Sequence, residues 1–248
     1  MGFVDAYSWG NWGYGMYDRG EGLQKDDRHV GWAMAGYGND AVGFLQPAGE
    51  GIAKALGNAR AAEAMATPII QAGLFAMMAM SNTCGFGDPN TGDQFSQGAE
   101  TFGKAKSKLE SAARPASWEG DAADAYDARN REHGSRVDRL KEADEAIKNA
   151  IKSEAEQNDV TRKMLDRCQT VLGLSIIPAI ALNAYPGWGQ AASLVFQTAA
   201  VAGTLPPAEW RYLDLIDNSA RNATLIRRAG ATYDEVAAQA GDWPGACR

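Results

Sequence analysis

The chain has 248 residues, 45% hydrophobic and 22% charged, which suits one large domain or two small ones and argues against disorder. Its formal net charge of −7 argues against broad nucleic-acid binding, which needs a basic face to displace counterions from phosphate. It has only two histidines, and its three cysteines form no CxxC pair. We therefore expect no disulfide framework, no metal site, no cofactor and no catalytic residue.

The first segment, residues 1–90, opens with about 40 residues rich in Gly, Trp and Tyr that show no clear periodicity. Its start has neither a basic region nor a continuous apolar region, so a signal peptide of the general secretory pathway is not expected. The Ala-rich sequence from Asn39 to about Met80 predicts a helix, with an early turn at Pro47 and a kink at Pro68.

The second segment, residues 91–170, follows a loop of turn-forming residues and has the clearest periodicity. Apolar residues from Phe95 to Ala113 recur at spacings of four and three, which predicts one helix that ends before Pro115. A second stripe from Tyr126 to Cys168 predicts a helix of about 45 residues that begins near Gly120. The short connection implies that the two helices fold back as a long antiparallel hairpin.

The predicted seam of this hairpin is unusually polar. Its residues are Tyr126, Asn130, His133, Val137, Leu140, Asp144, Ile147 and Ile151, and the same stripe continues through Glu154 and Asn158. One interpretation places the polar members on a solvated flank, with the true stripe drifting to Ala143, Ala150 and Ala155. The other makes them determinants of register and partner choice, because polar seam residues cost stability but specify pairing.

The third segment, residues 171–248, is largely uncharged at its start. Between Gln169 and Ala208 the only ionisable side chain is Tyr185. Pro178, the Tyr185–Gly189 break and Pro206 are expected to cut this stretch into short pieces, so it predicts either a packed helical hairpin or a membrane-active one. The candidate membrane or assembly contacts are Ile176, Ile177, Ile180, Trp188, Leu194 and Phe196.

Two more helices are expected to close the chain. Pro206 and Pro207 are predicted to begin one helix, and Thr232 with Glu235 forms a capping box for a short last helix. The predicted fold class is thus all-α, a long antiparallel hairpin packed with additional N- and C-terminal helices.

The hairpin turn carries the most informative motif, Trp118-Glu119-Gly120. Trp118 is expected to bury a large aromatic surface in the turn, and Gly120 allows the chain to reverse without a Cβ penalty. Together with the following run to Tyr126, with Asn130 to His133, and with Leu140, Asp144 and Thr161-Arg162, this motif resembles the ESX (type VII) secretion-associated proteins of the EspA/EspE type. The resemblance covers about residues 93–170 and extends loosely to 205.

This resemblance implies a WXG-like helical hairpin and a mycobacterial substrate of type VII secretion. A Y-x-x-x-[D/E] export signal is expected after the second helix, but Tyr185, Tyr212 and Tyr233 do not fit it. The only fits, Tyr14 with Asp18 and Tyr17 with Glu21, lie near the N-terminus. The resemblance therefore implies that a small WXG-like helical partner, secreted together with this chain, supplies the signal.

The sequence accordingly predicts a non-enzymatic protein that is secreted or located in the cell envelope by a Sec-independent type VII route. It would act through assembly with that small partner. The alternative is a self-assembling filament or ring, that is, a homo-oligomer, or a membrane-active surface protein.

Overall fold

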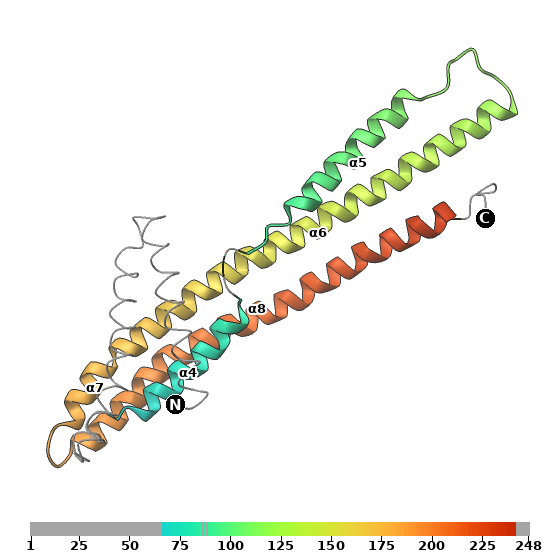
Figure 1. Ribbon diagram of the computed structural model, residues 1–248. Coiled ribbons are helices and arrows are strands. Elements are labelled where there is room, and N and C mark those ends of the chain that lie inside the picture. Colours follow the sequence, from blue (N-terminus) through green and yellow to red (C-terminus); the bar gives the residue numbers. More distant parts are fainter. Residues whose placement is uncertain (1–65, 86, 88, 242–248) are drawn as a thin grey trace, which may run out of the picture. The chain divides into compact units, whose positions relative to one another are not determined.

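The computed structural model describes residues 66–85, 87 and 89–241 (Figure 1). Regular structure in this part of the chain is entirely helical, which confirms the predicted all-α fold class. The helices are α4 (Pro68–Thr83), α5 (Asp93–Ser111), α6 (Asp121–Leu174), α7 (Ile176–Asn183) and α8 (Gly189–Gly241).

Helix α4 begins at Pro68, and residues 66 and 67 before it are not helical. A proline is favoured at the first position of a helix because its missing N–H has no helical acceptor there. The predicted kink at Pro68 is therefore wrong, since the proline begins a helix. The remainder of the predicted helix, residues 39–65, and the Trp-rich start lie outside the described residues.

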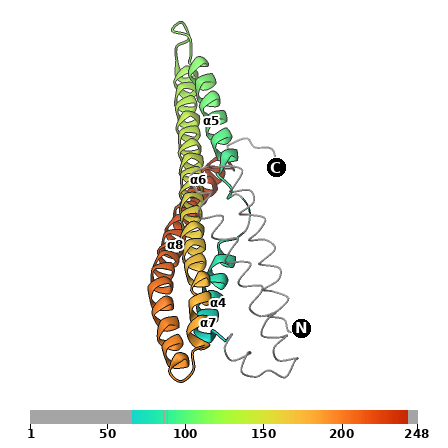
Figure 2. The same cartoon turned by 90° about the vertical axis from the view of Figure 1, so that its left-hand side faces the viewer.

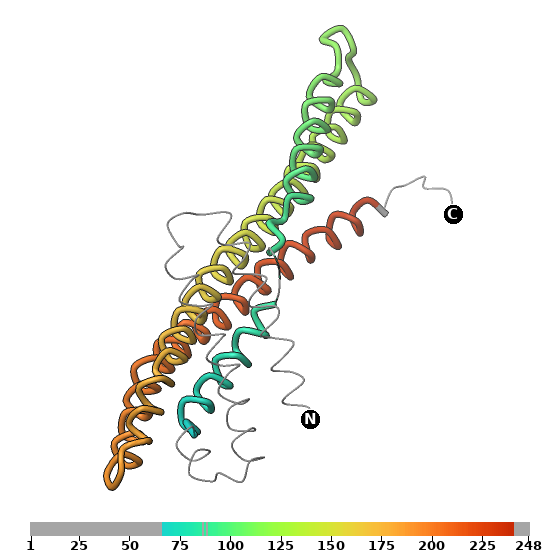
Figure 3. Tube along the Cα trace, turned by 60° about the vertical axis from the view of Figure 1, so that its left-hand side comes forward, coloured from blue at the N-terminus to red at the C-terminus, as the bar shows by residue number. Residues whose placement is uncertain are grey.

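Helices α5 and α6 run side by side in opposite directions, as Figures 1 and 3 show. Helix α6 has 54 residues, so the predicted length of about 45 was too short. The prediction ended the helix at Cys168, where the polar periodicity stops. The next residues, 169–174, contain no proline, and the helix continues through them even though one of them is Gly173.

The break predicted around Tyr185–Gly189 separates α7 from α8, and Gly187 has a φ of +92° there. Pro178 does not interrupt α7. It is the third residue of that helix, where its missing N–H falls within the first turn and costs no helical hydrogen bond.

Helix α8 runs unbroken for 53 residues through Pro206 and Pro207. The predictions that Pro206 ends one helical piece and that a new helix begins there are therefore wrong. The fixed φ of proline is compatible with a helix, and the carbonyls that lose a donor belong to Ala202 and Gly203, which lie on the exposed side. The predicted capping box is also wrong, since Thr232 lies inside α8 and its hydroxyl bonds to the carbonyl of Arg228 at 3.3 Å.

The chain forms two compact units, to both of which α6 and α8 contribute. Unit 1 comprises α4, α7, the second part of α6 from Asp159, and α8 up to Asp214; unit 2 comprises α5, the first part of α6, and α8 from Leu215. The segment boundaries that we place at residues 90 and 170 from the sequence stay predictions.

Each unit has its own core. In unit 1, α4 packs against α7 and the adjoining parts of α6 and α8 (Figure 2). The large side chains that are buried completely or almost completely there are Ile70, Met77, Leu165, Leu172 and Ile176. In unit 2 the core is thinner: Ala143, Ile147 and Ala229 are buried, and Phe95, Ile151 and Tyr233 pack around them.

Candidate functional site

The connection between α5 and α6 is held by local contacts. Gly120 has a φ of +103°, a conformation that favours glycine, and its carbonyl accepts the first backbone hydrogen bonds of α6. The ring of Trp118 lies 5.3 Å from that of Tyr126, centroid to centroid. Trp118 nevertheless stays 40% exposed, so the expectation that the turn buries it is wrong. It covers Tyr126, whose hydroxyl donates to the carbonyl of Ala112 at 2.6 Å.

Polar contacts fix the antiparallel register of α5 and α6. The Asn130 side-chain amide donates to the Leu109 carbonyl at 2.9 Å, near the turn. Further along, two lysines bridge the helices. They are Lys106, 2.7 Å from Asp138, and Lys148, 2.9 Å from Ser96.

The third helix of unit 2, α8, forms hydrogen bonds with two other residues of the seam stripe. Tyr233 donates a hydrogen bond to the buried carboxylate of Asp144, and Ser219 and Asn222 both donate to Glu154. Burial, with the Asp144 carboxylate as a second cause, raises the pKa of Tyr233 above its ordinary value. These side chains therefore attach the C-terminal part of α8 to α6.

The buried face of α6 contains residues from both stripes that the sequence indicated, and the role of the polar members in partner choice stays a prediction. Ala143 and Ala150 are buried, as the drifting stripe requires, yet Asp144 and Ile147 are buried too. The buried face of α6 is wide because α5 and α8 contact it from two sides. The other predicted seam residues lie at the edges. His133, Val137, Leu140 and Ile151 are half-buried, and Tyr126 is 38% exposed.

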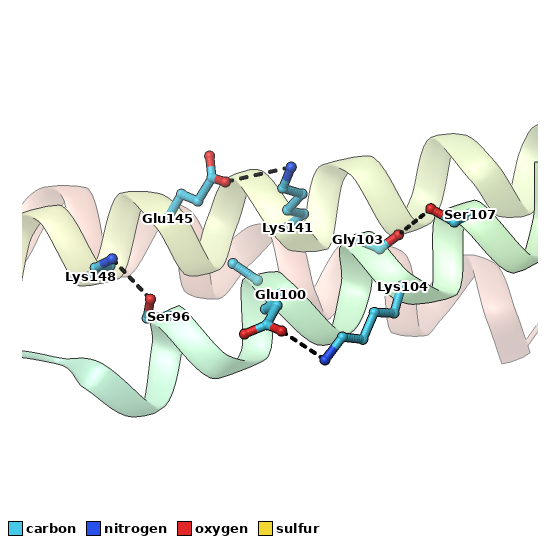
Figure 4. A pocket seen from close by; sticks show the side chains of 9 residues that line it. Ser96, Glu100, Gly103, Lys104, Ser107, Lys141, Glu145 and Lys148 are labelled. Atoms are coloured by element: carbon cyan, nitrogen blue, oxygen red, sulfur yellow. Dashed lines mark hydrogen bonds and ion pairs between the residues drawn. The ribbon is translucent and has the colours of Figure 1, made fainter.

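Two open grooves lie between α5 and α6. The polar groove, of about 450 Å³, is lined by Ser96, Ala99, Glu100, Gly103, Lys104, Ser107, Lys141, Glu145 and Lys148. Figure 4 shows two ion pairs there, Lys104 with Glu100 at 2.7 Å and Lys141 with Glu145 at 3.7 Å, whereas Lys148 donates to the Ser96 hydroxyl. Four of the charged side chains in this groove are thus paired with one another.

The apolar groove, of about 430 Å³, is lined by Ala105, Lys108, Leu109, His133, Arg136, Val137 and Leu140. Its floor is aliphatic, and Lys108, His133 and Arg136 lie beside it. The Arg136 guanidinium pairs with Glu132 and donates to the Gln239 carbonyl, whereas Lys108 is exposed. Three predicted seam residues, His133, Val137 and Leu140, come together here. The sequence pattern placed these three on α6, but it could not show which α5 residues complete the groove.

The predicted membrane or assembly contacts separate into two groups. Ile176 is buried in unit 1, and Ile180 and Phe196 are half-buried. Ile177, Trp188 and Leu194 are exposed, and the Trp188 ring packs against Tyr185 with 5.2 Å between centroids. Only the exposed group is placed to contact something outside this unit.

The thiols of Cys84 and Cys168 are buried, and that of Cys84 donates to the Met80 carbonyl at 3.5 Å. Burial raises the pKa of both, and for Cys84 the charge of Arg162 partly opposes this. Such thiols are poor nucleophiles because they carry little thiolate. Among the described residues, no group of three or more His, Cys, Asp or Glu side chains is arranged to hold a metal ion.

These observations define a helical protein with two open grooves along a pair of antiparallel helices. Residues 84–167, which span α5, the turn and most of α6, match the model of the EspA/EspE family. The chain is 31% identical over 183 residues to ESX-1 secretion-associated protein EspE of Mycolicibacterium smegmatis, covering 74% of this chain and 35% of that protein. It is 28% identical over 172 residues to ESX-1 secretion-associated protein EspA of Mycobacterium tuberculosis, covering 69% of this chain and 44% of that protein.

The predicted resemblance to ESX secretion-associated proteins of the EspA/EspE type is thereby confirmed. The chain spans less than half the length of these curated relatives. Neither the family description nor the relatives' names specify a catalytic activity. No solved structure matches the chain.

Proposed function

We propose that this chain is a non-enzymatic, type VII secretion-associated protein that is exported to the cell envelope or beyond by a Sec-independent route. In this proposal it acts by pairing with a small WXG-like helical protein that is secreted with it. The observation that carries the proposal is the apolar groove between α5 and α6, because all seven of its lining residues lie within the stretch that matches the EspA/EspE family.

The shape and charge of the apolar groove favour a helix as its occupant. A groove between two antiparallel helices with an aliphatic floor accepts the apolar face of a third helix. The exposed charge of Lys108 at the edge of the groove favours an acidic side chain beside that face. The polar groove on the same helix pair lacks such a floor and serves as an internal comparison.

A matched pair of charge reversals tests the pairing. Lys108 lines the apolar groove, and Lys104, one turn earlier on α5, lines the polar groove; both side chains are exposed. We expect Lys108→Glu to weaken binding of the small WXG-like protein that we propose as the partner. The expected loss of affinity is roughly 3- to 10-fold, as for reversal of a charge at the edge of an interface. Lys104→Glu should change the affinity less than about twofold. Isothermal titration calorimetry on the full chain measures both.

Equal weakening by both variants would show that α5 contributes only through its overall charge and would contradict the groove assignment. If the parent chain binds no such protein and instead has a mass above that of a monomer in light scattering, the self-assembling alternative replaces the proposal.

The proposed export route leads to a separate prediction. The chain should be present in the culture filtrate or envelope fraction of a strain with an intact type VII apparatus and be retained in the cytosol of a strain that lacks it. Mass spectrometry of the fractions measures this, with a Sec-dependent protein as the control. Unchanged export in the strain without the apparatus would contradict the route.

The segments containing Tyr14 with Asp18 and Tyr17 with Glu21 lie outside the described residues, so their role as export signals stays a prediction.

A further inference from the structure

One end of unit 1 lacks charge altogether. It consists of residues 66–83, which include α4, and residues 169–208, which include α7 and the start of α8. The only ionisable side chain in these residues is the phenol of Tyr185. We refer to residues 66–83 and 169–208 as the uncharged end.

Large apolar side chains project outward from the uncharged end. Six of them are between 46% and 71% exposed: Phe75, Ile177, Tyr185, Trp188, Leu194 and Val195. They come from α4, α7, the α7–α8 connection and α8, so every part of this end has exposed apolar surface. We refer to the α7–α8 connection, residues 184–188, as the tip. Isolated exposed apolar residues are ordinary on soluble proteins, but a group of this kind without an intervening charge marks a contact surface.

Two polar side chains of the same end, Ser193 and Gln197, point inward, while Gln71 and Gln190 are exposed. Ser193 is buried and donates to the Ala179 carbonyl at 2.8 Å. Gln197 is also buried; its amide donates to the Ser193 hydroxyl at 3.1 Å and its carbonyl accepts from the Ile69 backbone at 3.2 Å. These bonds join α4, α7 and α8 through their interior, so these polar groups need no water.

Two hydroxyl groups nearer the surface also bond within their helices. Thr198 is exposed and donates to the carbonyl of Leu194 at 2.8 Å, and Ser175 donates to that of Val171 at 2.9 Å. Internal pairing of polar groups, with apolar side chains outside, is what a hydrocarbon solvent demands of a protein.

The length of the uncharged end suits a bilayer. Because Pro206 does not end α8, the uncharged part of that helix is a single piece of 20 residues, 189–208. At a rise of 1.5 Å per residue such a piece is about 30 Å long, as long as the hydrocarbon core is thick. The Tyr185–Trp188 pair sits at the tip, and these two residue types favour the boundary between lipid and water.

The α6–α7 stretch Asp121–Asn183 also contains a segment that is long and apolar enough to cross a membrane, 39% of which is buried in the protein. Core helices of soluble proteins can meet the same criterion of length and composition. The inward polar groups and the outward apolar ones, not composition alone, therefore favour lipid as the occupant of this surface.

We infer that the uncharged end is a lipid-binding element that inserts into the hydrocarbon of a bilayer, with the tip around Tyr185 and Trp188 leading. The uncharged end has no cationic side chain, and the chain carries a net charge of −7. We therefore expect its binding to a bilayer not to depend on anionic lipid headgroups. This inference concerns unit 1, whereas the proposed pairing groove lies in unit 2, so that either can fail without the other.

Two leucines of α8 with the same exposure provide a matched test. Leu194 lies in the uncharged end and Leu225 lies in unit 2, and both are 46% exposed. The full chain should float with vesicles of phosphatidylcholine, and adding phosphatidylglycerol should not increase the bound fraction. Leu194→Lys should weaken binding at least about tenfold, because a lysine in hydrocarbon is strongly unfavourable. Leu225→Lys should change binding less than about twofold.

Val195→Lys, at the most exposed of the six positions, provides a second variant, and far-UV circular dichroism verifies that each variant keeps the parent's helicity. Absence of binding to phosphatidylcholine vesicles, or equal weakening by Leu194→Lys and Leu225→Lys, would overturn the inference. A third result would also overturn it: a parent chain that does not bind vesicles and forms oligomers, which Leu194→Lys converts to monomers. The surface would then bind a second copy of this chain.

Discussion

Replacing Gly73 by leucine is expected to destabilise unit 1 by about 3 kcal/mol, the upper range for overpacking a core. Gly73 is buried in α4 where it faces two other helices. A Cβ added there would lie 3.0 Å from Cδ2 of Leu172 and 3.1 Å from Cγ2 of Val201. Both neighbours belong to long helices, so neither can move away without displacing other contacts. Urea unfolding of the full chain, followed by circular dichroism, measures the loss.

Gly203 is the matched control on α8, because a Cβ there would have no neighbour within 4 Å. Gly203→Leu should raise the free energy of unfolding by about 0.5–1 kcal/mol, the gain in helix propensity over glycine. A loss of stability of similar size in both variants would show that the close approach at Gly73 does not limit the packing of unit 1.

A compensating substitution makes the packing argument stricter. Leu172 is fully buried, and Leu172→Ala alone should cost about 2–5 kcal/mol through the cavity it leaves. A leucine at position 73 would fill part of that cavity. The double variant should therefore be more stable than the sum of the single effects predicts by at least about 1 kcal/mol, whereas additivity within about 0.5 kcal/mol would contradict a direct contact.

The importance of Gly73 could not have been predicted from the sequence. It lies in an Ala- and Met-rich stretch, and it matters only because three helices approach closely at its position. The same holds for the groove: spacing placed His133, Val137 and Leu140 on one face of α6, while Ala105, Lys108 and Leu109 reach them only through the register of α5. Periodicity identifies the face of a helix but not its neighbour.

Local signals, in contrast, predicted most of the elements. The periodic stripe, Pro115 and Gly120 give α5 and the start of α6 to within a few residues, because their causes lie in adjacent residues. The errors in α8 have the opposite origin. Pro206 and Pro207 are strong local breakers, but tertiary packing on both sides of them keeps one helix, with Ala208 and Leu215 buried just beyond.

This difference between local and distant causes is most evident at Asp144. Its position in the seam follows from spacing, but its partner Tyr233 lies 89 residues away in sequence. We expect Tyr233→Phe to destabilise unit 2 by about 1–3 kcal/mol, because the buried carboxylate would lose its hydrogen-bond donor. Tyr212→Phe is the control. The Tyr212 hydroxyl accepts only an exposed bond, from Thr83 at 2.8 Å, so its loss should cost less than about 0.5 kcal/mol.

The pH dependence distinguishes this pair from a purely structural role of the Tyr233 ring. Because the pKa of Tyr233 is raised in the folded chain, the folded state keeps a proton that the unfolded state releases near pH 10. The stability that this group contributes is fully present below about pH 10 and is lost as the pH rises further. The gap in unfolding free energy between the parent and Tyr233→Phe should therefore narrow above that pH, measured by urea unfolding at a series of pH values. A gap that stays constant would mean that the ring alone matters, and α8 would then be attached to α6 by packing around Ala229 without the Tyr233–Asp144 hydrogen bond.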